Sequence, residues 1–109
     1  MKRKPPAGGD SHLRTREEIA RILQEHKAEL RERYGVRELG LFGSYVRGEQ
    51  RRRSDVDILV EFDTVPGLLK FLELEEYLSR LLGLRVDLVR RASIRKELRE
   101  RILSEVVMV

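Results

Sequence analysis

The run Val56–Phe62 (VDILVEF) constrains the fold more than any other segment of this sequence. Five of its seven residues are apolar, and polar residues flank it on both sides. A short apolar run with such flanks is typical of a buried β-strand. A buried strand needs neighbouring strands, and helices that cover the sheet. We therefore expect a sheet at the centre of the fold.

Three other segments have the apolar character of strands. Residues 36–42 and 85–89 are short and mostly apolar, and each follows a glycine or a turn that ends a helical pattern. The last four residues, Val106–Val109, are also apolar. We interpret this C-terminal segment either as a final strand or as an edge that binds a partner.

Helical periodicity predicts helices between these strands. The first helix is expected to begin after Thr15, because Thr15-Arg16-Glu17-Glu18 has the form of a capping box, and to run to about Tyr34 before Gly35. His26 falls on its apolar side, as a residue at the edge of the core. The remaining predictions are one helical turn at 45–48, a leucine-rich helix at 68–82 that Gly83 ends, and a last helix that Ser93 caps.

The resulting order of helix, strand, short helix, strand, helix, strand and helix indicates an α/β fold. A strand that follows a helical crossover is expected beside the preceding strand, in one sheet with helices packed on a face. Periodicity leaves open whether the strands run parallel or antiparallel. With 109 residues, the chain has room for one domain and one modest core.

Composition limits the classes of function. No apolar run approaches the roughly 20 residues that span a bilayer, and the N-terminus (MKRK) lacks the apolar stretch of a signal peptide. Cysteine is absent, which excludes disulfides and thiolate metal sites and is compatible with the cytoplasm. Two histidines are too few for a His-rich site. Any metal must therefore be held by oxygen, which favours Mg²⁺ or Mn²⁺.

The net charge of +4 is concentrated at the N-terminus. Residues 1–14 hold four basic residues against one acidic residue, and their Pro-Pro and Gly-Gly pairs are typical of a flexible tail. Residues 15–109, the expected domain, are left with a net charge of only +1, because their many arginines alternate with glutamates. A basic groove for nucleic acid is therefore not indicated.

The first chemical signal is Gly43-Ser44, which follows the predicted strand at 36–42. Between a strand and a helix, glycine and serine usually form a turn with an N-cap. The functional alternative is that Gly43 lets the backbone approach a phosphate, to which the helix N-terminus and the Ser44 hydroxyl donate. Taken alone, the pair favours the structural interpretation.

The second signal is Asp55-Val56-Asp57, where the buried strand begins. Side chains two residues apart on a strand point to the same face, with Cα atoms roughly 6.5–7 Å apart. Two carboxylates beside an apolar run repel each other unless a cation such as Mg²⁺ lies between them. The alternative is that both are solvated residues at the strand entry, which suits Asp55 better than Asp57.

The third signal is Asp87, a lone acid within Arg85-Val86-Asp87-Leu88-Val89. By default such an acid pairs with Arg85 or faces water. If its strand lies beside the strand of Asp57, the three carboxylates can converge. Three acids at adjacent strand ends can hold two divalent ions for in-line phosphoryl or nucleotidyl transfer.

Together, these residues resemble the signature of the polymerase-beta-type nucleotidyltransferase superfamily. Gly43-Ser44 is followed by ten residues and then by Asp55-x-Asp57, with Asp87 further along in an apolar strand. The longer strings LFGSYVRG (41–48) and SDVDILV (54–60) resemble the minimal nucleotidyltransferases (MNT) of prokaryotes. The resemblance extends from about Val36 to the C-terminus, and no catalytic position is missing.

The resemblance implies a small nucleotidyltransferase fold, with a short mixed sheet and helices mainly on one face. It implies that Gly43 and Ser44 bind the triphosphate of a nucleotide such as ATP. It also implies that Asp55 and Asp57 bind two Mg²⁺ ions, and that Asp87 holds the ion which activates the attacking hydroxyl. Arg47 either contacts phosphate or forms a salt bridge with an acid such as Glu49. The run 51–53 (RRR) either neutralises phosphate or is simply solvated.

The resemblance also suggests a partner. Minimal members often act as antitoxins of helical HEPN-domain ribonucleases, and some attach AMP to a tyrosine of that toxin. The leading hypothesis is therefore adenylylation of a cognate HEPN toxin, in a homo- or hetero-oligomer. The alternative is a non-catalytic antitoxin that acts by binding through the leucine-rich helix or the C-terminal segment. A nucleic-acid-binding regulator that uses the basic tail is the least favoured hypothesis.

Overall fold

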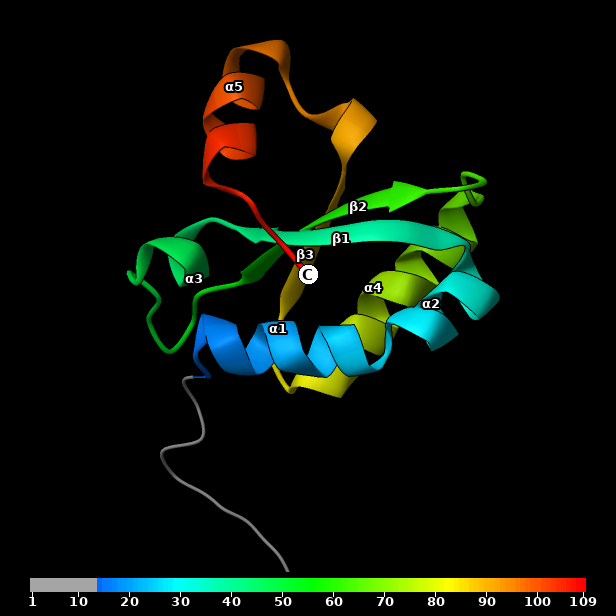
Figure 1. Cartoon of the computed structure of the whole chain (residues 1–109), viewed down its shortest axis with the longest axis horizontal. Coiled ribbons are helices and arrows are strands. Elements are labelled where there is room, and N and C mark those ends of the chain that lie inside the picture. The colour runs from blue at the N-terminus through cyan, green and yellow to red at the C-terminus, as the bar shows by residue number, and fades with distance from the viewer. Residues whose placement is uncertain (1–13) are drawn as a thin grey trace, which may run out of the picture.

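A computed structural model describes residues 14–109 of the chain. The predicted tail, residues 1–14, lies outside the described residues except for Arg14, whose Nε donates a hydrogen bond of 2.8 Å to the carbonyl of Leu82. Among residues 14–109, every helix is too short or too polar to cross a membrane. This part of the chain contains five α-helices, one 3₁₀ helix and four strands (Figure 1).

The four strands form one mixed sheet, in the order β3-β2-β1-β4. Its strands are β1 (Val36–Phe42), β2 (Val56–Phe62), β3 (Val86–Arg90) and β4 (Val107–Met108). β1 pairs antiparallel with β2 and β4, whereas β2 and β3 run parallel. The predicted central strands are confirmed, and so is the interpretation of the C-terminal segment as a strand.

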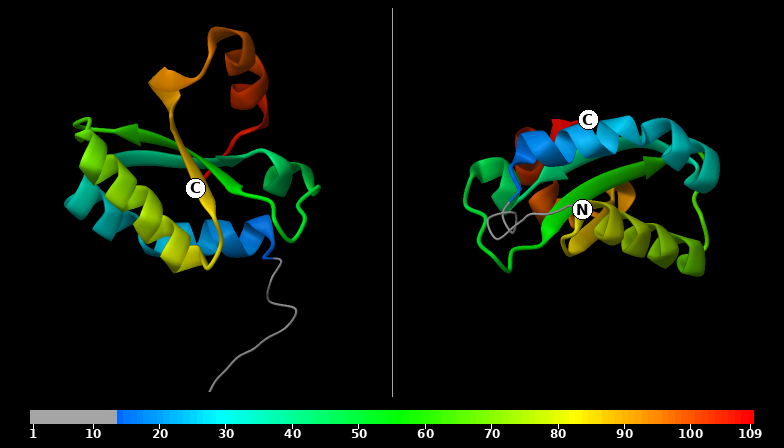
Figure 2. Two further views of the ribbon diagram at one scale, coloured as in Figure 1. Left: turned by 180° about the vertical axis from the view of Figure 1, so that it is seen from behind. Right: turned by 90° about the horizontal axis from the view of Figure 1, so that it is seen from below.

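Most helices cover one face of this sheet, as the α/β prediction with helices mainly on one face requires. α1 (Arg16–Glu25), α2 (Lys27–Tyr34) and α4 (Leu68–Leu82) lie on that face, and α5 (Lys96–Glu105) lies on the other (Figures 1 and 2). Because side chains alternate along a strand, β2 sends Ile58 and Val60 into the main core and Leu59 to the opposite face. There Leu59 packs with Phe42 and Ile94 in a second, smaller cluster.

The prediction of one continuous helix from residue 15 to 34 is wrong in one respect. Thr15 does form the expected capping box with Glu18, and Gly35 ends the segment in the left-handed conformation. The helix, however, is interrupted at His26, whose backbone lies outside the helical region at φ −106° and ψ 7°. The N–H of His26 bonds to Leu23 and its ring Nδ1 contacts the carbonyl of Ile22 at 2.8 Å, so the last turn tightens and α2 restarts.

Ser93 does not cap the last helix, which corrects a second prediction. Arg91–Ser93 instead form a 3₁₀ turn, and α5 begins at Lys96. Ile94 explains the difference, because its backbone is extended and its side chain is buried in the second cluster. The helix therefore begins only after this residue. The other helices match their predictions closely: α4 ends at Gly83, and the single turn α3 spans Ser44–Arg47.

Candidate active site

The strand register brings two of the predicted acids side by side. Asp57 of β2 is paired with Asp87 of the parallel strand β3, and on its other side with Phe42 of β1. Gly43 directly follows Phe42, so the turn after β1 lies against the first residues of strand β2. Three segments that are far apart in the sequence thus meet on the face of the sheet that carries α5.

Gly43 occupies a position that only glycine can fill. Its φ of +81° and ψ of −155° lie in a region essentially restricted to glycine. A Cβ atom built on Gly43 would also overlap the carboxylate of Asp57. The bare Cα therefore lets the backbone and the Asp57 carboxylate touch, and Ser44 begins α3 immediately afterwards.

The environment of Asp57 disfavours its ionised form. Burial is the largest cause, and repulsion by the carboxylates of Asp87 and Asp55 adds to it, so that the pKa of Asp57 is raised to about 6. Arg47 opposes the shift, whereas a hydrogen bond with Asp87 supports it. Asp57 and Asp87 therefore form a close pair of carboxyl groups whose repulsion is only partly compensated.

Asp55 points to a different partner. Its Oδ1 accepts a hydrogen bond of 3.0 Å from Nε of Arg85, in an ion pair whose two side chains are largely exposed. Within residues 14–109, no three acidic or histidine side chains are close enough together to hold one metal ion. The structure thus brings together Asp57 and Asp87 of the predicted three acids, and the role of Asp55 remains a prediction.

Arg47 makes the salt bridge that was foreseen as the alternative to a phosphate contact. Its Nε lies 3.0 Å from Glu49, and its Nη1 lies 3.2 Å from both carboxylate oxygens of Glu105. The same Glu105 accepts a 2.7 Å hydrogen bond from the backbone N–H of Gly43. Sequence reasoning missed Glu105, because nothing distinguishes it from the other charged residues of the last helix.

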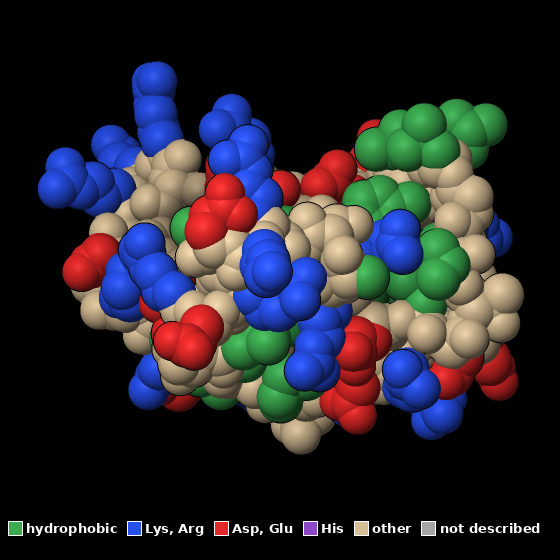
Figure 3. All heavy atoms as spheres, turned by 90° about the horizontal axis from the view of Figure 1, so that it is seen from above, with side chains coloured by type: hydrophobic (Ala, Val, Ile, Leu, Met, Phe, Trp, Pro, Cys, Tyr) green, Lys and Arg blue, Asp and Glu red, His purple; other side chains and the backbone are tan. Residues whose placement is uncertain are grey.

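The three arginines 51–53 are exposed in the loop between α3 and β2. This loop is held by Ser54, whose Oγ accepts a hydrogen bond of 2.8 Å from the N–H of Arg51. The exposure of the three arginines matches a solvated charge run. Asp55, the nearest candidate metal ligand in the sequence, pairs instead with Arg85. Figure 3 views the molecule from the α5 side and shows Lys and Arg side chains spread over this face, interspersed with acids.

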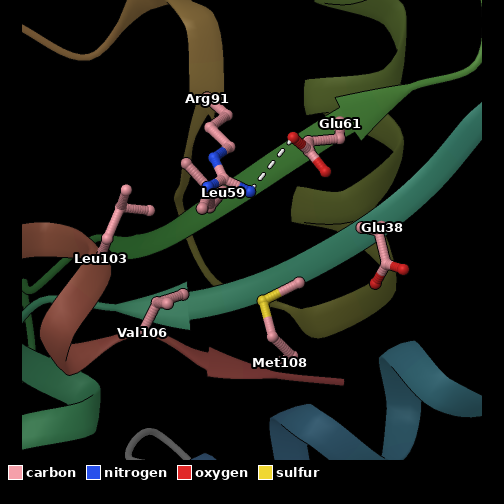
Figure 4. A pocket seen from close by; sticks show the side chains of 7 residues that line it. All are labelled: Glu38, Leu59, Glu61, Arg91, Leu103, Val106 and Met108. Atoms are coloured by element: carbon pink, nitrogen blue, oxygen red, sulfur yellow. Dashed lines mark hydrogen bonds and ion pairs between the residues drawn. The ribbon is translucent and has the colours of Figure 1, made fainter. Parts of the chain in front are cut away.

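A cavity of about 220 Å³ lies on the same face of the sheet, further along β2 (Figure 4). Leu59 forms part of its wall two residues beyond Asp57, α5 contributes Leu103, and Val106 follows directly after that helix. Its rim is charged, and Arg91 lies 3.4 Å from Glu61 across it. None of the residues that line it is one of the predicted metal-binding acids.

The donor set suits a hard divalent cation. Asp57 and Asp87 supply carboxylate oxygens, which Mg²⁺ and Mn²⁺ prefer. The raised pKa of Asp57 reflects burial first and then repulsion by Asp87 and Asp55, and a bound cation would offset both. The two acids therefore fit a magnesium site, and Asp55 beside them has one carboxylate oxygen, Oδ1, paired with Arg85.

Comparison with known proteins identifies close relatives of this chain. The family model for the nucleotidyltransferase domain matches residues 23–109. The chain is 63% identical over 95 residues to the protein adenylyltransferase MntA of Thermococcus cleftensis, and this match covers 87% of the chain and 96% of the relative. The acids Asp55, Asp57 and Asp87 and the Gly43-Ser44 turn all lie within the residues that the family model matches.

Solved structures share the fold. A toxin-antitoxin structure with AMP-PNP matches at a TM-score of 0.66 and 29% identity, over 78% of this chain and 69% of that one. A second structure, of a tri-AMPylated HEPN toxin of Shewanella oneidensis in complex with an MNT antitoxin, matches at a TM-score of 0.61 over 83% of this chain and 70% of that one. At 23% identity, the second similarity shows the fold alone.

Proposed function

Because this chain belongs to the nucleotidyltransferase domain family, we propose that it transfers AMP from ATP to a hydroxyl group of a partner protein. The observation that carries the proposal is the meeting of Asp57, Asp87 and the Gly43-Ser44 turn at one place on the sheet. A glycine turn beside paired carboxylates can hold both a phosphate chain and a cation. The chain is thus a nucleotidyltransferase with AMP as the proposed transferred group.

In the proposed reaction, the oxygen of the acceptor hydroxyl bonds to the α-phosphorus of ATP. The bond from that phosphorus to the pyrophosphate breaks, pyrophosphate leaves, and the hydroxyl proton is released. Gly43 and Ser44 would hold the phosphate chain in line for this attack, with Arg47 as a cationic contact. Positioning and charge stabilisation account for most of the rate in reactions of this kind.

Asp57 and Asp87 would hold Mg²⁺, with Asp55 as a further ligand and two ions in the complete site. When bound, the metal stabilises the negative charge on the phosphates and makes the acceptor hydroxyl a better nucleophile. The carboxylates themselves fix where that charge is placed relative to the Gly43-Ser44 turn. Mn²⁺ has the same preference for oxygen ligands and is the expected substitute.

The proposed acceptor is a tyrosine of a cognate HEPN-domain toxin, which makes this chain an antitoxin. Two relatives support transfer of AMP to a partner protein: one is named a protein adenylyltransferase, and another was solved as a toxin-antitoxin structure with AMP-PNP. The start of α4 offers a surface for a partner, because Val65, Leu68 and Leu69 are 56%, 72% and 83% exposed. The C-terminal segment, the other candidate surface, pairs with β1 as the edge strand of the sheet, and its Val107 and Met108 are 37% and 49% exposed.

Radiolabelled ATP tests the transfer. The chain is incubated with Mg²⁺, with a HEPN-domain protein of the same organism, and with ATP that carries the label on either the α- or the γ-phosphate. Nucleotidyl transfer puts the α-label on the partner and leaves the γ-label in pyrophosphate. Label from the γ-position on the partner would indicate phosphoryl transfer and would overturn the proposal. Undiminished α-label on the partner with Asp57→Ala would also overturn it.

A further inference from the structure

Glu105 holds the two donors that the proposed function assigns to a phosphate. The backbone N–H of Gly43 donates to its Oε2 at 2.7 Å. Nη1 of Arg47 lies 3.2 Å from both oxygens of the same carboxylate. A free backbone N–H and a guanidinium are the groups that typically bind phosphate oxygens. One side chain thus occupies the anion-binding groups of the candidate site.

These contacts are specific to the fold, since Glu105 lies 62 residues from Gly43 in the sequence. The carboxylate is sheltered, with only 19% of the side chain exposed, whereas its partner Arg47 is 37% exposed. Asp57 touches Gly43 from the Cα side. Two carboxyl groups therefore lie against one glycine, and their repulsion costs free energy.

The backbone beside Glu105 is held in place. The following residues of β4 pair with β1, where Val107 lies opposite Leu41 and Met108 opposite Gly40. The N–H of Val109 donates to the carbonyl of Leu39 at 3.0 Å, which extends this pairing to the last residue. The side chain of Glu105 can rotate away from Gly43 while α5 and β4 stay where they are.

We propose that Glu105 is an internal competitor for the phosphate groups of the nucleoside triphosphate, and that nucleotide binding displaces its carboxylate from Gly43 and Arg47. This inference rests on the proposed function, because it takes Gly43 and Arg47 as phosphate contacts. Glu105 thereby sets the affinity for the donor nucleotide.

Binding of AMP-PNP and of adenosine, measured by calorimetry in the presence of Mg²⁺, tests the inference on the full chain. Glu105→Ala is expected to tighten AMP-PNP binding roughly tenfold, because a charge-assisted contact no longer has to be broken. Adenosine, which lacks phosphates, is expected to bind both proteins equally. Glu105→Gln keeps the size of the side chain and is expected to give a smaller gain.

The matched control is Glu100→Ala. Glu100 is exposed on the same helix, and its replacement removes the same charge without touching Gly43 or Arg47. If Glu100→Ala tightens AMP-PNP binding as much as Glu105→Ala does, the effect comes from the overall charge of the protein, and the inference is overturned. Weaker or unchanged AMP-PNP binding by Glu105→Ala, with the wild type binding normally, would also overturn it. Absence of AMP-PNP binding in every variant would instead refute the nucleotide site itself, and the inference with it.

Discussion

The carboxylate of Asp57 fills the space in which a Cβ atom at Gly43 would lie. This contact joins the turn after β1 to the entry of β2, where Asp57 is paired in register with Asp87. It explains why the glycine, the serine after it and the acids belong to one site although they are separated along the chain. Changes at either member of the contact are expected to affect both the site and the stability of the fold.

Replacement of Gly43 by alanine is expected to abolish transfer and to destabilise the protein. The new Cβ would overlap Asp57, and the backbone would be forced out of its glycine conformation, at a cost of about 1–3 kcal/mol for the backbone alone. Urea unfolding measures the stability and labelled ATP measures the transfer.

Gly48→Ala is the control for Gly43→Ala. Gly48 also has a positive φ, of 75°, but a Cβ there would meet nothing within 4 Å. Its replacement is expected to cost about 1–2 kcal/mol of left-handed strain and to leave transfer intact in the folded fraction. Normal transfer by Gly43→Ala, or loss of transfer by Gly48→Ala, would contradict the assignment of the turn.

Asp57→Asn is expected to make the metal-free protein more stable above pH 6. The pKa of Asp57 is raised from 3.8 to about 6, so the wild type loses stability as the pH rises through that window and the carboxyl ionises. The asparagine variant lacks this loss. After allowance for solvent screening, the gain is about 1–2 kcal/mol at pH 7.5, and it vanishes near pH 4.

Urea unfolding at the two pH values, with EDTA present, measures this difference. Added Mg²⁺ provides the complementary test, because a cation that binds only the folded state stabilises it. The wild type is expected to gain stability with Mg²⁺ at pH 7.5 and Asp57→Asn is not. Equal stability of the two proteins at both pH values would show that Asp57 carries no unfavourable charge.

A comparison of Asp55→Ala with Arg85→Ala separates the two interpretations of Asp55. Each substitution breaks the same exposed ion pair, so each is expected to change stability by less than about 1 kcal/mol. If Asp55 is a metal ligand, transfer is lost only in Asp55→Ala. Equal loss of transfer in both variants would show that the pair with Arg85 is what the site needs.

Tyr45→Phe is expected to leave stability unchanged or to raise it by up to about 1 kcal/mol. Among residues 14–109, the hydroxyl oxygen of Tyr45 is one of two buried side-chain nitrogen or oxygen atoms that lack a hydrogen bond. Its removal therefore leaves no partner unpaired. The contrasting variant is Tyr77→Phe, which loses a 3.1 Å hydrogen bond to Glu29 and is expected to lose about 0.5–1.5 kcal/mol. Thermal unfolding compares them, and a clear loss in Tyr45→Phe would indicate that its hydroxyl does have a partner.

Local sequence patterns predicted the elements whose residues are set by burial. The apolar run of β2 and three leucines of α4, Leu74, Leu78 and Leu82, are buried where periodicity placed them, whereas the leucines at the start of α4 are exposed. Helix ends were less predictable. His26 interrupts the first helix through a contact of its ring, and Ile94 delays the last helix because its side chain is already buried in the second cluster.

The residues of the candidate site that belong to a local sequence motif could be predicted, and those that join it only through folding could not. Gly43 and Asp57 were found because their residue types and spacing are distinctive. The pairing of Asp55 with Arg85 depends on side-chain direction, which strand alternation alone does not fix. Glu105 reaches Gly43 only through the packing of α5 against the sheet, and no local pattern marks such a contact.

The most direct test of the central claim is the intact mass of a HEPN-domain protein of the same organism after incubation with this chain, ATP and Mg²⁺. The account predicts a mass increase of one or more AMP units on that partner, absent with Asp57→Asn and with Asp87→Asn. Peptide mapping is expected to place the AMP on a tyrosine. A tight complex with an unchanged partner mass, with every nucleoside triphosphate tried, would contradict the account and favour an antitoxin that acts by binding alone.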